Sequence, residues 1–151
     1  MEEQQIKNAA SLVFKTLGAG FCERVYHNAI EVYLRKIGTS FKSEHVIPVK
    51  FMDVEVGNVR ADLVINDRLV VELKVGPTIK DKHTTQCFMY MKLLKINNGL
   101  IINFPLSDDD EEVGEQELVL TEDTFCKRCG RDNHSAESCY AKKHLKGYFI
   151  N

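Results

Sequence analysis

The chain has 151 residues and a formal net charge of −2, with 44% hydrophobic and 28% charged residues, a balance typical of one globular domain with an apolar core. It has no run of about 18 apolar residues, so we expect no membrane-spanning helix. The polar start of the chain has no apolar segment of the secretory type, so we expect a reducing compartment, the cytoplasm or the nucleus.

Charge divides the chain into three segments. Residues 1–106 carry 14 Lys and Arg against 11 Asp and Glu, a balance of +3. Residues 107–125 carry nine acidic residues and no basic one, and residues 126–151 carry six basic residues against two acidic ones. We therefore predict a mildly basic domain over 1–106, an acidic connector over 107–125 and a small basic module over 126–151.

Hydrophobic spacing predicts two amphipathic helices at the start, residues 4–17 and 23–37, and a third helix over 78–96. Apolar residues at alternate positions and short apolar runs predict strands. In chain order these strands are residues 45–51, 54–56, 59–65, 69–75 and 100–104, with a short candidate at 118–120. Pro48 indicates an edge strand or a bulge. The order of the elements predicts an α/β fold with a mixed sheet.

Three charged residues stand out in the two strands between residues 59 and 75. Alternate residues of both strands are apolar and must face the core, so Asp62, Glu72 and Lys74 lie together on the opposite face. A two-residue turn would mix the polar and apolar faces. A three-residue turn over 66–68 keeps them apart and sets Asp62 opposite Glu72, about 5 Å away at Cβ. Arg68 is a poor occupant of the left-handed position that such a turn needs.

Two carboxylates that face each other repel unless a cation lies between them. Mg²⁺ or Mn²⁺ would remove the repulsion, because such ions bind one or two carboxylates together with water and a phosphate. Lys74 could then hold a water molecule or meet a phosphate oxygen, which is the arrangement for metal-assisted phosphodiester hydrolysis. The alternative is a solvated sheet face with an ion pair between Lys74 and either carboxylate. The residues alone leave the two interpretations balanced.

The pattern of Asp62 followed by Glu72-Leu73-Lys74 resembles the PD-(D/E)XK nuclease superfamily. Within it, the segment from Gly18 to Tyr26 resembles the signature of the GxxExxY family through Gly20, Glu23 and Tyr26. The predicted helix over 78–96 resembles the family's helix after the active-site strand. The residues that carry this second likeness share one helical face and are His83, Gln86 and Tyr90.

The resemblance covers residues 6–106 and implies a restriction-endonuclease-like fold, with a four-stranded mixed sheet flanked by helices. It implies that Asp62, Glu72 and the Leu73 carbonyl are ligands of Mg²⁺ or Mn²⁺. Lys74 would activate water or stabilise charge, and Glu23 would support the metal site from its helix.

The basic module contains Cys126, Cys129, His134 and Cys139, whose CCHC spacing predicts one tetrahedral Zn²⁺. Four protein ligands leave no position for a catalytic water, so this zinc is structural. The segment resembles the retroviral-type zinc knuckle, which binds single-stranded nucleic acid, and also the knuckles appended to proteins of large DNA viruses. A module that binds protein or caps the domain is the alternative.

Candidate nucleic-acid-binding residues occur in both parts of the chain. Lys127 stands where the knuckle family often has an aromatic residue for base stacking, and Tyr140 could partly replace that platform. The remaining candidates supply positive charge or an amide and are Arg131, Lys142, Lys143 and, in the main domain, Gln86.

Together these features predict a nucleic-acid-binding protein that is a metal-dependent phosphodiester hydrolase. The rival prediction is a catalytically silent protein that keeps the nuclease fold for a structural, assembly or nucleic-acid-packaging role. The nine acidic residues of 107–125 favour the rival, because such a run repels a nucleic-acid backbone within about 10 Å. The sequence leaves open the choice of DNA or RNA and whether the chain forms a homo-oligomer.

Overall fold

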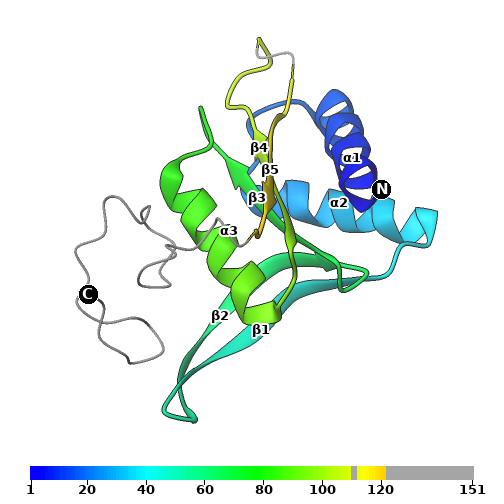
Figure 1. Ribbon diagram of the computed structural model, residues 1–151. Helices are drawn as coiled ribbons and strands as arrows, with labels where there is room; N and C mark the ends of the chain where they lie inside the picture. Colours follow the sequence, from blue (N-terminus) through cyan, green and yellow to red (C-terminus); the bar gives the residue numbers. More distant parts are fainter. Residues whose placement is uncertain (110–111, 122–151) are drawn as a thin grey trace. The chain divides into compact units, whose positions relative to one another are not determined.

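The computed structural model describes residues 1–109 and 112–121, and the described helices and strands lie within the unit Met1–Val119 (Figure 1). The predicted zinc ligands and the rest of the basic module (126–151) lie outside the described residues. No helix in the described part of the chain is long and apolar enough to cross a membrane.

Two helices open the fold, α1 (Glu2–Leu17) and α2 (Glu23–Ile37), close to the predicted bounds. Gly38 ends α2 in the left-handed conformation, at φ 73°, as expected for a glycine after a helix. Each helix buries one apolar stripe. The buried apolar residues are Ile6, Ala9, Ala10, Val13 and Phe14 of α1, and Tyr26, Ile30 and Leu34 of α2.

A five-stranded mixed sheet follows, in the order β1-β2-β3-β4-β5. Its strands are β1 (Phe41–Phe51), β2 (Val54–Ile65), β3 (Leu69–Val75), β4 (Asn98–Phe104) and β5 (Gly114–Val119). Only the β3–β4 pair is parallel, and α3 (Asp81–Leu94) makes the connection between these two strands. The predicted α/β class with a mixed sheet is confirmed.

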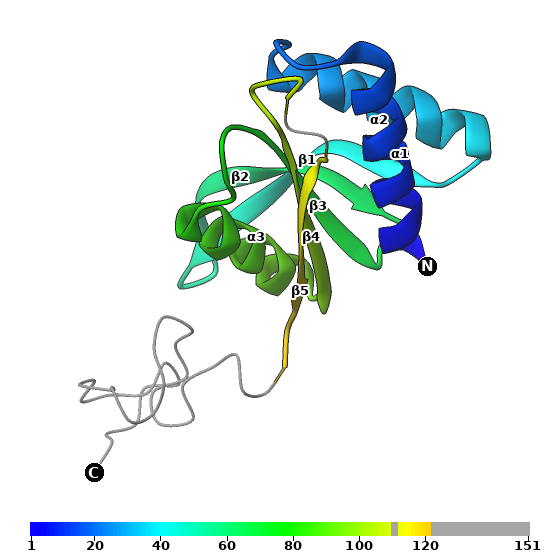
Figure 2. The ribbon, with the colours of Figure 1, turned by 90° about the horizontal axis from the view of Figure 1, so that it is seen from above.

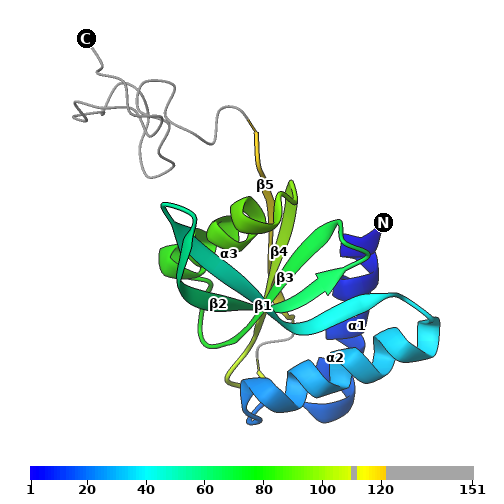
Figure 3. The same ribbon diagram turned by 90° about the horizontal axis from the view of Figure 1, so that it is seen from below.

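The structure adds strand residues where the sequence shows little alternation. The predicted strands 54–56 and 59–65 form one strand, β2, because β1 pairs with it along its whole length. Beyond the contact with β3, which ends at Leu63, these two strands extend as a ribbon that is paired only with itself (Figure 1, Figure 3). Pro48 lies in the edge strand β1, next to a register shift at Val49/Lys50, as predicted.

The fifth strand is the largest departure from the implied four-stranded sheet. β5 begins at Gly114, inside the predicted acidic connector, and pairs antiparallel with β4. It ends at Val119 and so overlaps the short strand candidate at 118–120. Leu118 is its one buried residue, so the segment has almost no apolar pattern. The strand forms because β4 otherwise has an open edge to which a chain of any polarity can add backbone hydrogen bonds.

Helices cover both faces of the sheet, α1 and α2 on one side and α3 on the other (Figure 2). The centre of the face against α1 and α2 is apolar. Its buried strand residues are Leu63, Ile65, Leu69, Val71, Leu73, Leu100, Ile102 and Phe104. We call this the core face, and the opposite side, which carries Asp62, Glu72 and Lys74, the catalytic face.

The turn between β2 and β3 has the predicted three residues, because Ile65 is paired with Leu69 and Leu63 with Val71. The left-handed positions are taken by Asn66 (φ 51°) and Asp67 (φ 55°), and Arg68 donates its N–H to the Ile65 carbonyl at 2.9 Å. The expectation that Arg68 occupies the left-handed position is therefore wrong. Asn and Asp tolerate that conformation well, so the turn fits its sequence.

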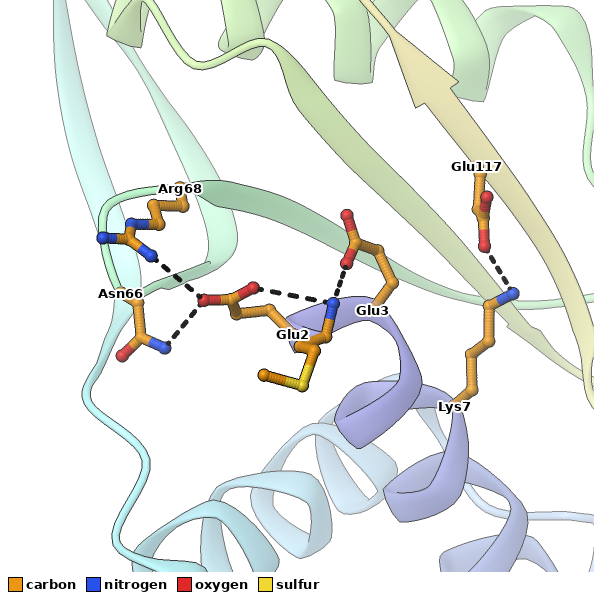
Figure 4. A network of polar contacts seen from close by, with 7 residues as sticks. Glu2, Glu3, Lys7, Asn66, Arg68 and Glu117 are labelled. Atoms are coloured by element: carbon orange, nitrogen blue, oxygen red, sulfur yellow. Dashed lines mark hydrogen bonds and ion pairs between the residues drawn. The ribbon is translucent and has the colours of Figure 1, made fainter.

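The start of α1 is fastened to this turn and to β5 by polar contacts (Figure 4). Glu2 accepts a hydrogen bond from Asn66 at 3.3 Å and lies 4.0 Å from the Arg68 guanidinium. Lys7 lies 2.6 Å from Glu117 and 3.1 Å from Glu115, measured between its Nζ and their Oε1 atoms. Two residues of the predicted acidic connector thus form ion pairs with α1.

Candidate active site

The strands β2 and β3 separate at the two carboxylates. Their backbone pairing runs from Ile65 and Leu69 to Leu63 and Val71. One step further, side chains take the place of the backbone acceptors. The Leu73 N–H donates to Asp62 Oδ2 at 2.8 Å, and the Asp62 N–H donates to Glu72 Oε1 at 3.2 Å. These reciprocal bonds bring together the two carboxylates that the register predicted to face each other.

Lys74 completes a buried cluster on the catalytic face. Its Nζ donates to Glu72 Oε2 at 3.3 Å, and the two side chains are 17% and 1% exposed. The ion pair of the alternative interpretation is therefore present, between Lys74 and Glu72, but it is buried and does not lie on a solvated sheet face. The face is closed because α3 packs over it, with Cys87, Tyr90 and Met91 buried.

Burial gives the cluster unusual proton affinities. Burial, reinforced by the charge of Asp62, raises the pKa of Glu72 from 4.5 to about 8. Burial by itself would lower the pKa of Lys74, but the charges of Glu72, Asp62 and Glu23 outweigh it and raise that pKa. The cluster therefore disfavours a second negative charge and favours the lysine as an ammonium.

Glu23, the first residue of α2, lies close enough to the cluster to interact electrostatically with Lys74 and Asp62. Burial raises the pKa of Glu23. The charge of Lys74 lowers this pKa and the charge of Asp62 raises it, and the net shift is upward. Glu23 and Asp62 line one pocket of about 180 Å³. The structure thus brings together all four side chains proposed from the sequence to carry the chemistry.

The segment before Glu23 is held by an aromatic anchor and a carboxylate. Tyr26 is fully buried, stacks on Phe104 with ring centroids 4.2 Å apart, and donates its hydroxyl hydrogen to the Gly18 carbonyl at 2.7 Å. Asp108 accepts a hydrogen bond from the Ala19 N–H at 2.6 Å. Gly18 has φ 76°, and a side chain there would collide with Asp108, which explains the glycine. These contacts fix where α2 begins.

Helix α3 contributes a polar rim beside Lys74. Lys74, Lys82, His83 and Gln86 line an open pocket of about 440 Å³. Gln86 donates to the Tyr90 hydroxyl at 2.8 Å, in agreement with the shared helical face expected for these residues. Burial and the charge of Lys74 lower the pKa of His83.

Sequence reasoning missed two sets of residues near the site. Asp108 was assigned to a solvated connector, and no local pattern distinguishes it from its acidic neighbours. His27 Nε2 lies 3.0 Å from both Ser43 Oγ and Glu31 Oε1, and this network lines the pocket of Glu23. Helical spacing was the available signal, because Glu23, His27 and Glu31 follow one another at intervals of four residues.

The donor set fits Mg²⁺ or Mn²⁺. In residues 1–109 and 112–121, no group of three or more His, Cys, Asp and Glu side chains has the arrangement of a complete metal site. Mg²⁺ does not need one, because it keeps several waters and binds one or two carboxylates together with phosphate. Asp62 and Glu72 supply these two carboxylates. Burial and the charge of Asp62 raise the pKa of Glu72, and a cation bound between the two would oppose this shift by favouring the ionised form.

Comparison with models of known protein families shows the family of this chain. The model of the PD-(D/E)XK nuclease superfamily matches residues 1–115. A search of curated proteins finds no match. The solved structure of SSO0001 is 21% identical, covers 67% of this chain with a TM-score of 0.49, and is itself covered over 52% of its length, about half. The alkaline exonuclease LHK-Exo from Laribacter hongkongensis is 11% identical, with 78% of this chain and 79% of that chain covered and a TM-score of 0.46.

Proposed function

Because the chain belongs to the PD-(D/E)XK nuclease superfamily, we propose that it binds nucleic acid and hydrolyses phosphodiester bonds with the help of Mg²⁺ or Mn²⁺. The observation that supports this most directly is the clustering of the three side chains. The Asp62 N–H donates to Glu72, the Asp62 carboxylate accepts from the Leu73 N–H, and Lys74 lies 3.3 Å from Glu72. Within the superfamily, Gly20, Glu23 and Tyr26 favour the GxxExxY family.

The proposed roles follow from the chemistry of each group. Asp62 and Glu72, with the Leu73 carbonyl that the family resemblance implies, would hold the cation. A bound cation would supply Lewis-acid stabilisation and an activated water. The raised pKa of Lys74 keeps its ammonium charged, which suits stabilisation of the developing phosphate charge better than removal of a proton. Glu23 would orient water at the open side of the cluster.

The direct test is cleavage of labelled single- and double-stranded DNA and RNA with Mg²⁺ or Mn²⁺. Wild type should cut at least one of these substrates, and addition of a chelator should stop it. Lys74→Ala should lower the rate by about 10²- to 10³-fold, as the loss of one charge-stabilising group does in other enzymes. Undiminished cleavage by Lys74→Ala would point to a contaminating nuclease and end the proposal.

An assembly role is the second candidate, and the ribbon of β1 and β2 is the observation that favours it. The tip of the ribbon exposes four large apolar side chains that are close in sequence, Phe51 (67%), Met52 (82%), Val54 (65%) and Val56 (63%), and exposed apolar groups of this size are common at interfaces between subunits. Sedimentation of wild type beside Phe51→Ser would separate the two candidates. A stable oligomer that dissociates on this substitution, with no cleavage of any substrate, would favour assembly.

We further propose that residues 126–151 form a separate zinc module that follows the domain, whose acidic segment contributes β5 (Gly114–Val119) to the sheet. Its four ligands would be Cys126, Cys129, His134 and Cys139. The basic and aromatic candidates Lys127, Arg131, Tyr140, Lys142 and Lys143 would add affinity for the nucleic-acid backbone, as Gln86 would at the catalytic face. Metal analysis after dialysis should give about one zinc per chain. A value near zero would remove the module from the proposal.

A further inference from the structure

A second pocket, of about 490 Å³, opens one strand away from Lys74. Its inner wall includes Asn103, which is the ladder partner of Lys74 in the parallel pair β3–β4, so both side chains lie on the catalytic face. The pocket lies where these two parallel strands end, the position at which open α/β sheets commonly bind ligands. Its other lining residues include Pro77, Ile79, Pro105, Glu112, Glu115 and Gln116.

Asn103 carries an unsatisfied hydrogen-bond acceptor at this pocket. The residue is 4% exposed, and its Nδ2 donates to the Gly76 carbonyl at 2.8 Å. Its Oδ1 is buried and has no hydrogen-bond partner within the described part of the chain. Buried carboxamide oxygens are almost always paired, so an exception indicates a missing donor. A bound ligand that presents an N–H group would supply it.

Glycines flank this carboxamide. A Cβ at Gly76 would lie 3.8 Å from Asn103 Oδ1, and a Cβ at Gly114 would lie 3.9 Å from Nδ2. Neither glycine has a positive φ, so the backbone itself does not require glycine at these positions. What the two glycines provide is space beside the carboxamide.

The chemistry of the walls restricts the ligand. Glu112 and Glu115 are the charged residues of the pocket, and both repel a phosphate. Pro77, Ile79 and Pro105 offer apolar surface to a flat ring, while Gln116 supplies an amide. A neutral, planar group with an N–H donor meets all these conditions.

We propose that this pocket binds one unpaired nucleobase of the substrate, with Asn103 Oδ1 accepting a hydrogen bond from the exocyclic amino group. The inference rests on the proposed function and names its substrate, a single strand or an unpaired strand end. The base turns into the pocket while its phosphate stays beside Lys74. Bases with an exocyclic amino group, such as adenine and cytosine, are preferred over thymine and uracil.

The test compares two short single strands that differ in one chemical group, one with adenine and the other with purine, which lacks the amino group. Fluorescence anisotropy in the presence of a chelator measures binding without cleavage. Wild type should bind the adenine strand about tenfold more tightly, the effect of one hydrogen bond to a buried acceptor. Asn103→Leu removes the acceptor at similar volume and should bind both strands equally. Asn98→Leu, the same substitution at an exposed position of β4, should keep the preference.

A second variant covers the case in which Asn103→Leu fails to fold. Gly76→Ala adds a methyl group in ordinary van der Waals contact with Asn103, so it should fold and should weaken binding of the adenine strand more than that of the purine strand. Equal affinity of wild type for both strands, or no binding of either, overturns the inference. A tenfold preference for the adenine strand in a protein that cleaves no substrate would support the base-binding pocket. It would contradict only the proposed hydrolase activity.

Discussion

The two faces of the sheet are made by the same strands but bury different kinds of side chain, apolar on one face and polar on the other. On the core face, the strand residues from Leu63 to Phe104 that pack against α1 and α2 are apolar and fully or almost fully buried. On the catalytic face, under α3, three polar side chains take comparable positions: Glu72 is 1% exposed, Asn103 is 4% exposed, and the Lys74 side chain is 17% exposed. Burial stabilises the first set and works against the second.

The contrast separates residues that stabilise the fold from residues for which we propose a ligand. A buried carboxyl whose pKa is about 8 and a buried carboxamide oxygen without a donor both cost stability in the free protein. Such groups indicate a ligand that satisfies them. A cation and a nucleic acid bound at the catalytic face would therefore offset the stability lost by burying these polar groups.

The acidic segment follows the same division. In β5, Glu115 and Glu117 point toward α1, where both pair with Lys7, while Gly114 and Gln116 lie beside Asn103 and Ile101 on the catalytic face. Alternation of the strand thus turns these two charges away from the catalytic cluster. This weakens the argument that the acidic run would repel a substrate, on which the silent alternative depends.

Asp62 and Leu63 are neighbours in β2 that point to opposite faces, and substituting each tests the division most sharply. Asp62→Asn should reduce cleavage by at least about 100-fold, because an amide is a poor ligand for Mg²⁺ and cannot balance its charge. The melting temperature in metal-free buffer should stay the same or rise, since one of two repelling carboxylates is gone. A large fall in melting temperature would show that Asp62 is a structural residue.

Leu63→Ala should have the opposite signature. Removal of a fully buried leucine from the core face should lower the free energy of unfolding by about 2–5 kcal/mol. The remaining folded fraction should keep its catalytic cluster and cut at a normal rate per folded molecule. Urea unfolding combined with a cleavage assay at low temperature measures both. A rate per folded molecule that falls as far as that of Asp62→Asn would break the distinction between the faces.

How far the sequence predicts this molecule also depends on the face. Alternation of Leu63, Ile65, Val71 and Leu73 was enough to obtain the strands, the three-residue turn and the register that sets Asp62 beside Glu72. The same rule suggested a solvated catalytic face, because polar residues at alternate positions usually face water. Only the packing of α3 decides that Glu72 is buried, and that packing depends on contacts between residues far apart in the chain.

Other features lacked a local signal for the same reason. β5 has one buried residue, Leu118, and its pairing depends on the open edge of β4 rather than on its own pattern. Asp108 is one of nine acidic residues in its segment, and only the fold brings it to the Ala19 N–H. Asn103 directly follows the apolar run from Leu100 to Ile102 in β4 and gave no hint of a pocket until its neighbours Gly76 and Gly114 were in place.

Glu72→Gln tests how much stability the protein loses by burying an ionisable carboxyl on the catalytic face, because this loss depends on pH. Burial, with the charge of Asp62, raises the pKa of Glu72 from 4.5 to about 8, so the folded protein holds a proton that the unfolded chain releases. This contribution to stability is fully present below pH 4.5 and is lost as pH rises through 8. Glutamine does not ionise, so without metal the variant should gain on wild type by about 1–3 kcal/mol between pH 5 and pH 9. Denaturant midpoints with a chelator that differ equally at both pH values would contradict the assigned shift.

The smallest expected effect concerns Tyr26. Its ring is buried on the core face, and its hydroxyl holds the segment that leads to Glu23 at the candidate active site. Tyr26→Phe keeps the ring stacked on Phe104 and removes only the hydroxyl that donates to the Gly18 carbonyl. The free energy of unfolding should fall by about 1 kcal/mol, the usual value of one hydrogen bond. If that bond fixes the start of α2, Glu23 gains freedom, and the cleavage rate at saturating substrate should fall several-fold while the Michaelis constant changes little. Tyr33→Phe, on the same helix and outside the Gly20 to Tyr26 motif, is the matched control and should leave the rate unchanged. A rate for Tyr26→Phe equal to that of the control would mean that the motif's tyrosine serves folding alone, and that the core and catalytic faces are energetically independent at this end of the sheet.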